Sequence, residues 1–289
     1  MPWQRLSFQR IKDKVKTMTD KNDLTAQKIS QNKEEQKGSF DEFVSTLLWA
    51  ALFALVIRSL FFEPFSIPSG SMKPTLVKGD FLFVNKMVYG YSRYSFPLGL
   101  GPIPEGTRVF GNMPERGDII VFKLPTNPSV DYIKRVVGLP GDEIQVRGGR
   151  LFINDEIVER DEIGSEATAS AMGFPQSLIA YNETLPNGVE HAILEESDDG
   201  PLDNTKTYIV PENHVFAMGD NRDNSQDSRV DNLVGYIPLE NIVGRAERIF
   251  MSVDSEQGKI WEIWNWPKAI QFERVFNNLR PHAKDGHDS

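Results

Sequence analysis

The chain has 289 residues, a formal net charge of −9 and 39% hydrophobic residues, which is enough to bury a core and excludes wholesale disorder. It contains no cysteine, which excludes disulfides, thiolate metal sites and cysteine nucleophiles. The histidines are scattered and form no H-E-x-x-H motif, which excludes a zinc hydrolase of that type; they are His191, His214, His282 and His287.

The first long apolar feature is the run FVSTLLWAALFALVIRSLFF, residues 43–62. It is uncharged as far as Ile57 and apolar around the whole helix circumference, which favours a membrane-spanning helix over a buried helix of a soluble protein. The side chain of Arg58 would extend to the lipid headgroups. Because the run begins more than forty residues into the chain and no A-x-A cleavage site follows it, we predict an uncleaved anchor.

The polar tail before this anchor, residues 1–42, carries nine Lys/Arg and seven Asp/Glu. Such a composition with few aromatic residues predicts a solvent-exposed segment. Basic residues flank the apolar run on both sides, among them Lys37 and Arg58. The positive-inside rule therefore selects no orientation here.

Beyond the anchor, short segments rich in β-branched and aromatic residues are separated by Gly, Pro, Asn and Asp, as in residues 80–90, 117–124, 131–139, 142–155 and 214–221. This pattern predicts a mostly β fold with tight turns. The run VRGGRLFIND predicts a hairpin with Gly148 and Gly149 at its tip. Helices do not alternate with strands, which argues against a doubly wound parallel sheet.

The net negative charge lies in residues 151–209, which hold thirteen Asp/Glu and two Lys/Arg. We interpret this segment as a solvated insertion that aids solubility. Its run ESDDG, residues 196–200, has carboxylates suited to calcium, but their spacing fits no EF-hand loop, so no metal site is assigned. Near the C-terminus, Trp261, Trp264 and Trp266 either pack in the core or lie at a membrane interface.

The segment IPSGSMKPTL, residues 67–76, places Ser69 and Ser71 two positions apart. Alternation along an extended chain puts both hydroxyls on one face. A nucleophilic serine needs a base to take its proton. Two common motifs of catalytic serines are missing. There is no G-x-S-x-G elbow, and S-x-x-K is absent because Met72 and Pro74 occupy the positions where lysine would be.

A candidate base is Lys134, which lies in the apolar run DYIKRVVGL. A lysine accepts a proton only if its pKa falls from the ordinary value of about 10.4, and burial among apolar groups has that effect. From the residues alone, Lys134 is either such a buried base or an edge-strand lysine that points to water.

Four segments in this order resemble the signature boxes of the bacterial type I signal peptidases: PSGSMKPTL, RGDIIVF, YIKRVVGLPGD and GDNRDNSQDSR. The resemblance covers residues 65–245 apart from the acidic insertion, and four boxes in register are far more specific than any one of them. It implies the family fold, a mostly β body of coiled antiparallel sheets preceded here by one N-terminal transmembrane helix.

The resemblance also implies a role for each matching residue. Ser71 would be the nucleophile and Lys134 the general base. Ser69 would donate a hydrogen bond to the oxyanion, and Ser225 would orient the lysine amine. The implied supporting ion pairs are Arg135 with Asp220 and Asp227 with Arg229. The implied substrate-binding residues are Phe65, Ile67, Pro68, Met72, Leu76, Leu82, Asp131, Tyr132 and Ile133, of which Leu76 and Leu82 suit plain core packing equally well.

The implied domain organisation is a cytoplasmic tail (1–42), an anchor (43–62), two parts of a catalytic β core (63–150 and 210–255) around the acidic insertion (151–209), and a C-terminal Trp-rich segment (256–289). With a single anchor in the bacterial inner membrane, the catalytic body would lie in the periplasm. The expected partners are the lipid bilayer and secretory preproteins delivered by the Sec and Tat pathways. No cofactor, metal or nucleic acid is expected.

The implied activity is removal of signal peptides from exported preproteins, with cleavage after small residues at the first and third positions before the cut, through an acyl-enzyme. An extended substrate would add as a strand along residues 65–68 and 131–133. Two alternatives remain. One is another Ser/Lys processing peptidase with the same core, such as a self-cleaving SOS-response repressor or a conjugation-pilus peptidase. The other is a catalytically silent, membrane-anchored binding module.

Overall fold

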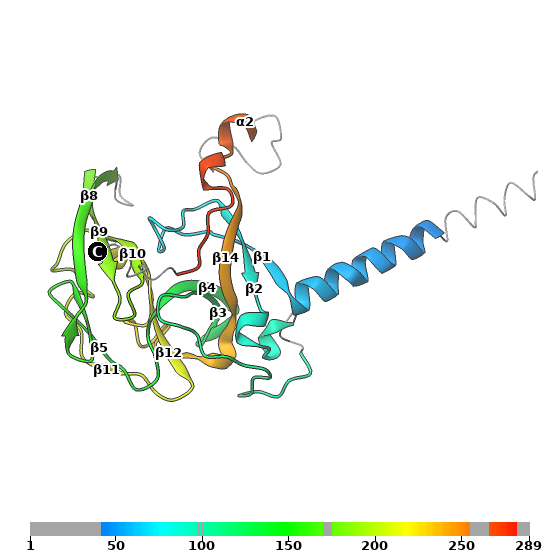
Figure 1. Cartoon of the computed structure of the whole chain (residues 1–289), viewed down its shortest axis with the longest axis horizontal. Helices are drawn as coiled ribbons and strands as arrows, with labels where there is room; N and C mark the ends of the chain where they lie inside the picture. Colours follow the sequence, from blue (N-terminus) through cyan, green and yellow to red (C-terminus); the bar gives the residue numbers. More distant parts are fainter. Residues whose placement is uncertain (1–41, 97–98, 100, 170–174, 255–265, 282–289) are drawn as a thin grey trace, which may run out of the picture. The chain divides into compact units, whose positions relative to one another are not determined.

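The structure, a computed structural model, describes residues 42–281 except 97–98, 100, 170–174 and 255–265. Figure 1 shows the chain coloured along its sequence. The chain divides into two compact units, residues 1–56 and residues 57–289, and each is described by itself. The tail and two of the clustered tryptophans, Trp261 and Trp264, lie outside the described residues.

The predicted anchor forms a helix, Glu42–Leu60, that is long and apolar enough to cross a membrane. Its large apolar side chains are exposed, with Trp49 and Phe53 both at 68%. The helix is therefore not built like the core helix of a soluble domain. It ends two residues earlier than the apolar run, because Phe62 already begins the first strand.

A seven-stranded antiparallel sheet forms the centre of the second unit, in the order β1-β2-β14-β3-β4-β12-β13. The strands are β1 (Phe62–Ser66), β2 (Asp80–Asn85), β3 (Ile119–Leu124), β4 (Asn127–Gly138), β12 (His214–Met218), β13 (Ile237–Pro238) and β14 (Ile242–Ser252). Strand β3 is apolar almost throughout because both of its faces are covered: Val121 joins one buried cluster and Ile120 another. The mostly β fold predicted from the sequence is confirmed.

Two smaller sheets accompany the central sheet among the described residues of this unit. A four-stranded sheet has the order β11-β5-β6-β7 and contains β5 (Glu143–Arg147), β6 (Arg150–Ile153), β7 (Glu156–Ile157) and β11 (Tyr208–Ile209). The predicted hairpin is present: Arg147 pairs with Arg150, and Gly148 and Gly149 have φ of 53° and 70°. Positive φ at both tip residues is the requirement of the type I′ turn, which glycine meets without strain.

The acidic insertion forms all three strands of the third sheet, which has the order β10-β9-β8: β8 (Glu159–Ala169), β9 (Pro175–Thr184) and β10 (Glu190–Glu195). Figure 1 shows these strands together. Leu185 and Val189, in the turn between β9 and β10, join a buried cluster with Phe216 of β12. Glu183 and Glu195 are buried as well, at 1% and 2% exposed. The interpretation of the segment as merely solvated is therefore wrong for these residues, because this part packs against the central sheet.

The remaining helices in the described ranges are short. They are η1 (Met87–Tyr89), η2 (Arg93–Ser95), η4 (Arg222–Asn224), η5 (Leu239–Asn241), α2 (Trp266–Ala269) and η7 (Phe272–Arg274). The α2 segment pairs with the end of β14 through a bridge between Val253 and Ile270. Trp266, the described member of the tryptophan cluster, is partly buried at the start of α2.

Candidate active site

The two serines lie in the loop between β1 and β2, and this loop is held from both sides. Ile67, Met72 and Leu76 are buried in the apolar cluster of the central sheet. On the other side, the Asn221 backbone N–H donates to the Ser71 carbonyl over 3.1 Å, and its side chain donates to the Gly70 carbonyl over 3.1 Å. Ser71 thereby has a defined position and is 9% exposed.

Lys134 projects from β4 and meets Ser71. Its Nζ donates hydrogen bonds to Ser71 Oγ over 2.7 Å and to the Ile133 carbonyl over 2.8 Å. The residue is 3% exposed, so Lys134 is a buried lysine and not an edge-strand lysine that points to water. Burial lowers the pKa of Lys134 to about 8, although the negative charges of Asp227 and Asp220 oppose the shift. A considerable fraction of the amine is therefore neutral in mildly alkaline solution.

The other two predicted serines lie near this pair. The Ser69 hydroxyl is 3.4 Å from Ser71 Oγ, on the exposed side. The Ser225 hydroxyl is buried and interacts with the Asp227 carboxylate, whose pKa it helps to lower. The expected hydrogen bond between Ser225 and the lysine is not among those of the amine, which go to Ser71 and to the Ile133 carbonyl.

Gly219 lies next to both the Ser225 hydroxyl and the Ser71 carbonyl oxygen, and its lack of a side chain leaves room for them. A Cβ at position 219 would lie 2.2 Å from Ser225 Oγ and 2.5 Å from the Ser71 carbonyl oxygen. Neither contact is possible for a real side chain, so the site requires glycine there. Sequence reasoning missed Gly219 and Asn221 as site residues, although both lie in the GDNRDNSQDSR box.

Both expected ion pairs are present and buried. Arg135 donates to the two oxygens of Asp220 over 2.8 and 2.7 Å. Arg229 donates to the two oxygens of Asp227 over 2.9 Å each. Burial opposes ionisation of Asp220 and Asp227, but the paired arginines outweigh it and lower both pKa values. The carboxylates stay charged: the Arg135–Asp220 pair fixes the segment around Ser225 to β4, and the Asp227–Arg229 pair holds that segment internally.

Thr75 is a further residue that sequence reasoning missed. Its hydroxyl donates to Asp220 Oδ2 over 2.6 Å, which ties the serine loop to the Arg135–Asp220 pair. The only signal available was its place in the PSGSMKPTL box.

The serine–lysine pair opens onto a groove of about 1610 Å³. This volume exceeds that of a usual small-molecule pocket and suits a peptide segment. The predicted binding residues that line it are Pro68, Asp131, Tyr132 and Ile133. Ile67, Met72, Leu76 and Leu82 instead lie in the apolar cluster, all at most 3% exposed, and Phe65 packs against that cluster.

Two strands next in sequence to groove-lining residues have unpaired edges. Strand β1 is the edge strand of the central sheet. Strand β4 pairs with β12 only from Arg135 to Gly138, so in the described part of the chain the same side of its residues 127–134 has no strand partner. A peptide can add to such an edge by main-chain hydrogen bonds.

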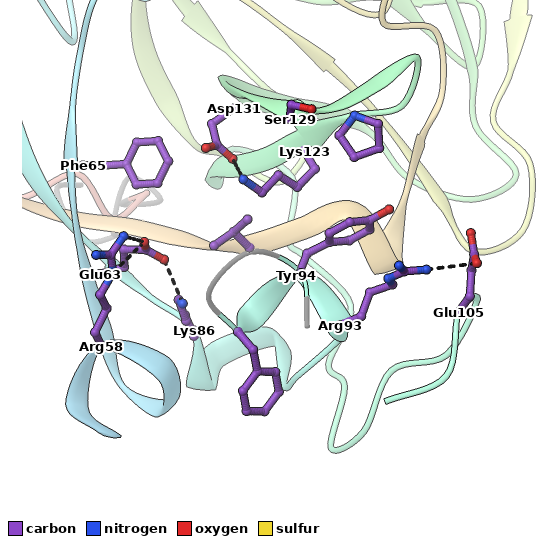
Figure 2. A pocket seen from close by; sticks show the side chains of 14 residues that line it. Arg58, Glu63, Phe65, Lys86, Arg93, Tyr94, Glu105, Lys123, Ser129 and Asp131 are labelled. Carbon is purple, nitrogen blue, oxygen red and sulfur yellow. Dashed lines mark hydrogen bonds and ion pairs between the residues drawn. The ribbon is translucent and has the colours of Figure 1, made fainter. Parts of the chain in front are cut away.

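A second pocket of about 830 Å³ adjoins the groove at Asp131, which lines both. Figure 2 shows that its charges are matched within the protein. Glu63 pairs with Arg58 over 2.7 Å and with Lys86 over 2.8 Å, and Lys123 pairs with Asp131 over 2.8 Å. Ser71 and Lys134 do not line this pocket, so the nucleophilic chemistry belongs to the groove.

Comparison with known proteins gives one consistent family. The sequence model of the family described as "Signal peptidase, peptidase S26" matches residues 40–251. Signal peptidase I of Rickettsia typhi is 39% identical over 263 residues, which cover 86% of this chain and 97% of that protein. Signal peptidase I of Rickettsia canadensis is 39% identical over 241 residues, which cover 78% and 88%.

A crystal structure of a signal peptidase I from Enterococcus faecalis V583 is 24% identical, with a TM-score of 0.27, and the match covers 46% of this chain and 97% of that one. The match of the family's sequence model to most of the chain, together with the identity to the Rickettsia proteins, decides the assignment. The chain belongs to the signal peptidase family, peptidase S26, and is by that membership a serine peptidase.

Proposed function

We propose that this chain is a membrane-anchored endopeptidase that removes N-terminal signal peptides from exported preproteins, with Ser71 as nucleophile and Lys134 as general base. The observation that carries the proposal is the 2.7 Å contact between the Ser71 hydroxyl and the buried Lys134 amine. Family membership supports the substrate class. A binding module would have no need of a lysine kept apart from water and from carboxylates beside a serine.

In the proposed reaction, the neutral Lys134 amine takes the Ser71 proton while the serine oxygen attacks the scissile carbonyl carbon. The tetrahedral oxyanion accepts hydrogen bonds from the Ser69 hydroxyl and from backbone N–H. The lysine ammonium then gives its proton to the leaving amine, and an acyl-enzyme remains. Neutral Lys134 next activates a water molecule, which hydrolyses the ester and regenerates Ser71.

The substrate would lie extended in the groove as an added strand between the segment that contains Pro68 and the unpaired edge at Tyr132 and Ile133. Main-chain hydrogen bonds contribute affinity for any sequence, so selectivity for particular substrate side chains depends on the space beside Ser71. Small residues at the first and third positions before the cut follow from the family resemblance. Ile67, Met72, Leu76 and Leu82 would shape this space from the apolar cluster rather than line it.

The helix Glu42–Leu60 would hold the body at the bilayer, where signal peptides emerge. We place the tail in the cytoplasm and the body in the periplasm, so that the enzyme meets preproteins delivered by the Sec and Tat pathways. A protease-accessibility assay on spheroplasts tests this orientation: protease added outside should degrade the body and leave the tail intact.

The decisive experiment incubates the full chain, purified in detergent, with a preprotein and sequences the new N-terminus. Cleavage directly after the signal peptide supports the proposal, whereas cleavage elsewhere indicates another Ser/Lys processing peptidase. A mechanism-based acylating inhibitor should add its mass to Ser71 in the wild type. Binding of the preprotein without cleavage or acylation would show a silent binding module instead.

A further inference from the structure

Three carboxylates from three successive segments meet beside the groove: Glu195 at the end of β10, Asp203 in the following loop, and Asp223 in η4. One oxygen from each lies within 4.8 Å of the others. Calcium takes oxygen ligands at about 2.3–2.6 Å, so two ligands of one ion lie up to roughly 5 Å apart. The spacing of the three oxygens therefore fits a single ion between them.

The second observation is a buried, unsatisfied carboxylate oxygen on two members of this cluster. Glu195 is only 2% exposed, and its Oε2 is buried without a hydrogen-bond partner among the described residues. Its other oxygen faces the Arg160 guanidinium at 3.3 Å. Asp223 is arranged in the same way: Oδ2 accepts from the backbone N–H of Glu196 and Ser197 over 2.6 and 3.1 Å, and Oδ1 is buried without a partner.

Such oxygens are costly to bury, because a carboxylate gives up hydration that nothing replaces. The arginines around the cluster do not offset this cost fully. Arg222 is paired with Glu183 and Arg229 with Asp227, while Arg160 is shared between Glu195 and the exposed Asp198. A divalent cation would satisfy the two orphaned oxygens and the local negative charge at once.

The backbone around the cluster also leaves room for this convergence. The Gly200 N–H donates to Asp203 Oδ2 over 2.6 Å. A Cβ at Gly200 would lie 2.8 Å from Asp223 Oδ1 and 3.0 Å from Asp203 Oδ2, so a side chain there would push the carboxylates apart. The loop that carries ESDDG thus contributes through its two flanks, Glu195 and Asp203, rather than as an EF-hand.

We infer that Glu195, Asp203 and Asp223 form a binding site for a hard divalent cation of the calcium type, which joins the acidic insertion to the segment that precedes Ser225. The all-oxygen donor set selects calcium or magnesium over softer metals. Calcium is favoured because it accepts irregular arrangements of oxygen ligands, whereas magnesium demands a near-ideal octahedron at about 2.0–2.1 Å.

The location gives the ion a structural consequence. Pro201 and Leu202 of the loop and Asp223 of η4 all line the groove, together with Ser225. An ion that binds the loop to η4 would hold this wall of the groove in place. Calcium should therefore raise the stability of the folded chain by mass action, since the unfolded chain has no such site.

The rival occupant is a proton. Burial raises the pKa of Glu195 to about 8, although Arg222 and Arg160 oppose the shift, so in neutral solution without a metal this carboxyl holds a proton. A protonated Glu195 would donate a hydrogen bond to one of the aspartates and satisfy part of the cluster without any cation. The two occupants are separated by whether calcium binds.

The test uses the full chain, purified in detergent and stripped with EDTA, in calorimetric titrations with CaCl₂ and separately with MgCl₂. We expect one calcium per chain and an apparent melting temperature that rises by roughly 5 °C at a hundredfold excess over the Kd. Magnesium should bind at least tenfold more weakly. Neither readout depends on peptidase activity, so a failure here leaves the proposed function untouched.

Three variants sharpen the test. Glu195→Gln and Asp223→Asn should each weaken calcium binding at least tenfold, and Asp223→Asn keeps an oxygen for the N–H groups of Glu196 and Ser197 if Glu195→Gln fails to fold. Asp199→Asn removes an exposed charge from the same loop and should bind calcium like the wild type. Absence of calcium binding to the wild type, or equal binding by Asp199→Asn and Asp223→Asn, would overturn the inference.

Discussion

Two lysines are buried in the described part of the chain, and they face opposite surroundings. Lys86, 1% exposed, meets Glu63 Oε2 at 2.8 Å and donates to the Ser95 carbonyl over 2.6 Å, as Figure 2 shows for the pair with Glu63. Lys134, 3% exposed, makes no ion pair within that part and reaches a serine hydroxyl instead. Burial lowers both pKa values, but at Lys86 the charge and hydrogen bond of Glu63 oppose it.

The difference teaches what a lysine base requires. Burial alone is insufficient, because a carboxylate partner favours the ammonium form and opposes the lowering of the lysine pKa. The negative charges near Lys134 belong to Asp220 and Asp227, and each is already paired with an arginine. Because these carboxylates pair with the arginines and not with the lysine, the Lys134 amine can lose its proton and act on Ser71.

The largest expected effect follows from removing either member of the serine–lysine pair. Ser71→Ala and Lys134→Ala should each lower kcat/KM for preprotein cleavage by at least about 10⁴-fold, because members of a catalytic unit fail together. The double variant should be no worse than either single one. The matched control is Lys86→Ala, which removes the other buried lysine and should keep its turnover per folded molecule. An active Lys134→Ala would contradict the assignment of the base.

Ser69→Ala should produce a smaller loss, which separates oxyanion stabilisation from the base. Removal of one oxyanion donor costs on the order of 10²–10³-fold in turnover. The loss should fall on kcat rather than on KM, because the oxyanion exists only in the transition state. Acylation of Ser71 by a mechanism-based inhibitor, followed by mass spectrometry, should slow without stopping. Unchanged kcat would remove Ser69 from the mechanism.

The pH dependence should report the lowered pKa of Lys134 directly. The amine must be neutral to accept the serine proton, so activity rises with pH and levels off above the pKa of about 8. Between pH 6 and pH 7.5 the neutral fraction, and with it kcat/KM, should rise about tenfold per pH unit. Initial rates on a signal-peptide substrate in buffers of constant ionic strength measure the profile. A flat profile over this range would mean that Lys134 is not the base.

Much of the site could be predicted because its residues lie in short sequence motifs. The apolar neighbours of Lys134 left a buried lysine as one of two interpretations, and the family boxes singled out Ser71, Lys134, Arg135 and Asp220 as site residues. What escaped depends on contacts between distant segments: Asn221 binds the loop around Gly70, and Glu195 meets Asp203 and Asp223.

The three-stranded sheet of the insertion escaped for a related reason. Strand β8 reads ERDEIGSEATA, and its charged residues hide any apolar alternation. Strand β8 is instead held by its pairing with β9, and Leu185, which follows β9, is buried in the core. Pairing between strands, rather than the propensity of either one, decides the fold here.

Because the surroundings of the two lysines differ, substitutions at the two sites should change the free energy of unfolding in opposite directions. Glu63→Gln leaves Lys86 buried without its carboxylate and should lower the free energy of unfolding by about 3 kcal/mol, near the low end for buried pairs because Glu63 stays partly exposed. Urea-induced unfolding followed by tryptophan fluorescence measures the change. Glu105→Gln, which breaks the exposed pair with Arg93, is the matched control and should change stability by less than about 1 kcal/mol.

Lys134→Met should do the reverse and stabilise the protein at neutral pH. Because the pKa of Lys134 is lowered by folding, the unfolded chain binds its proton more tightly, and the resulting cost is fully present below about pH 8. Replacement by methionine removes that cost, a gain of up to about 3 kcal/mol that is offset in part by the lost hydrogen bond to Ser71. The gain should shrink as pH rises from 8 towards 10.5, where the amine is neutral in both states. If Lys134→Met destabilised the chain as much as Glu63→Gln, Lys134 would have to be a satisfied, charged lysine like Lys86, and the contrast that makes it a base would disappear.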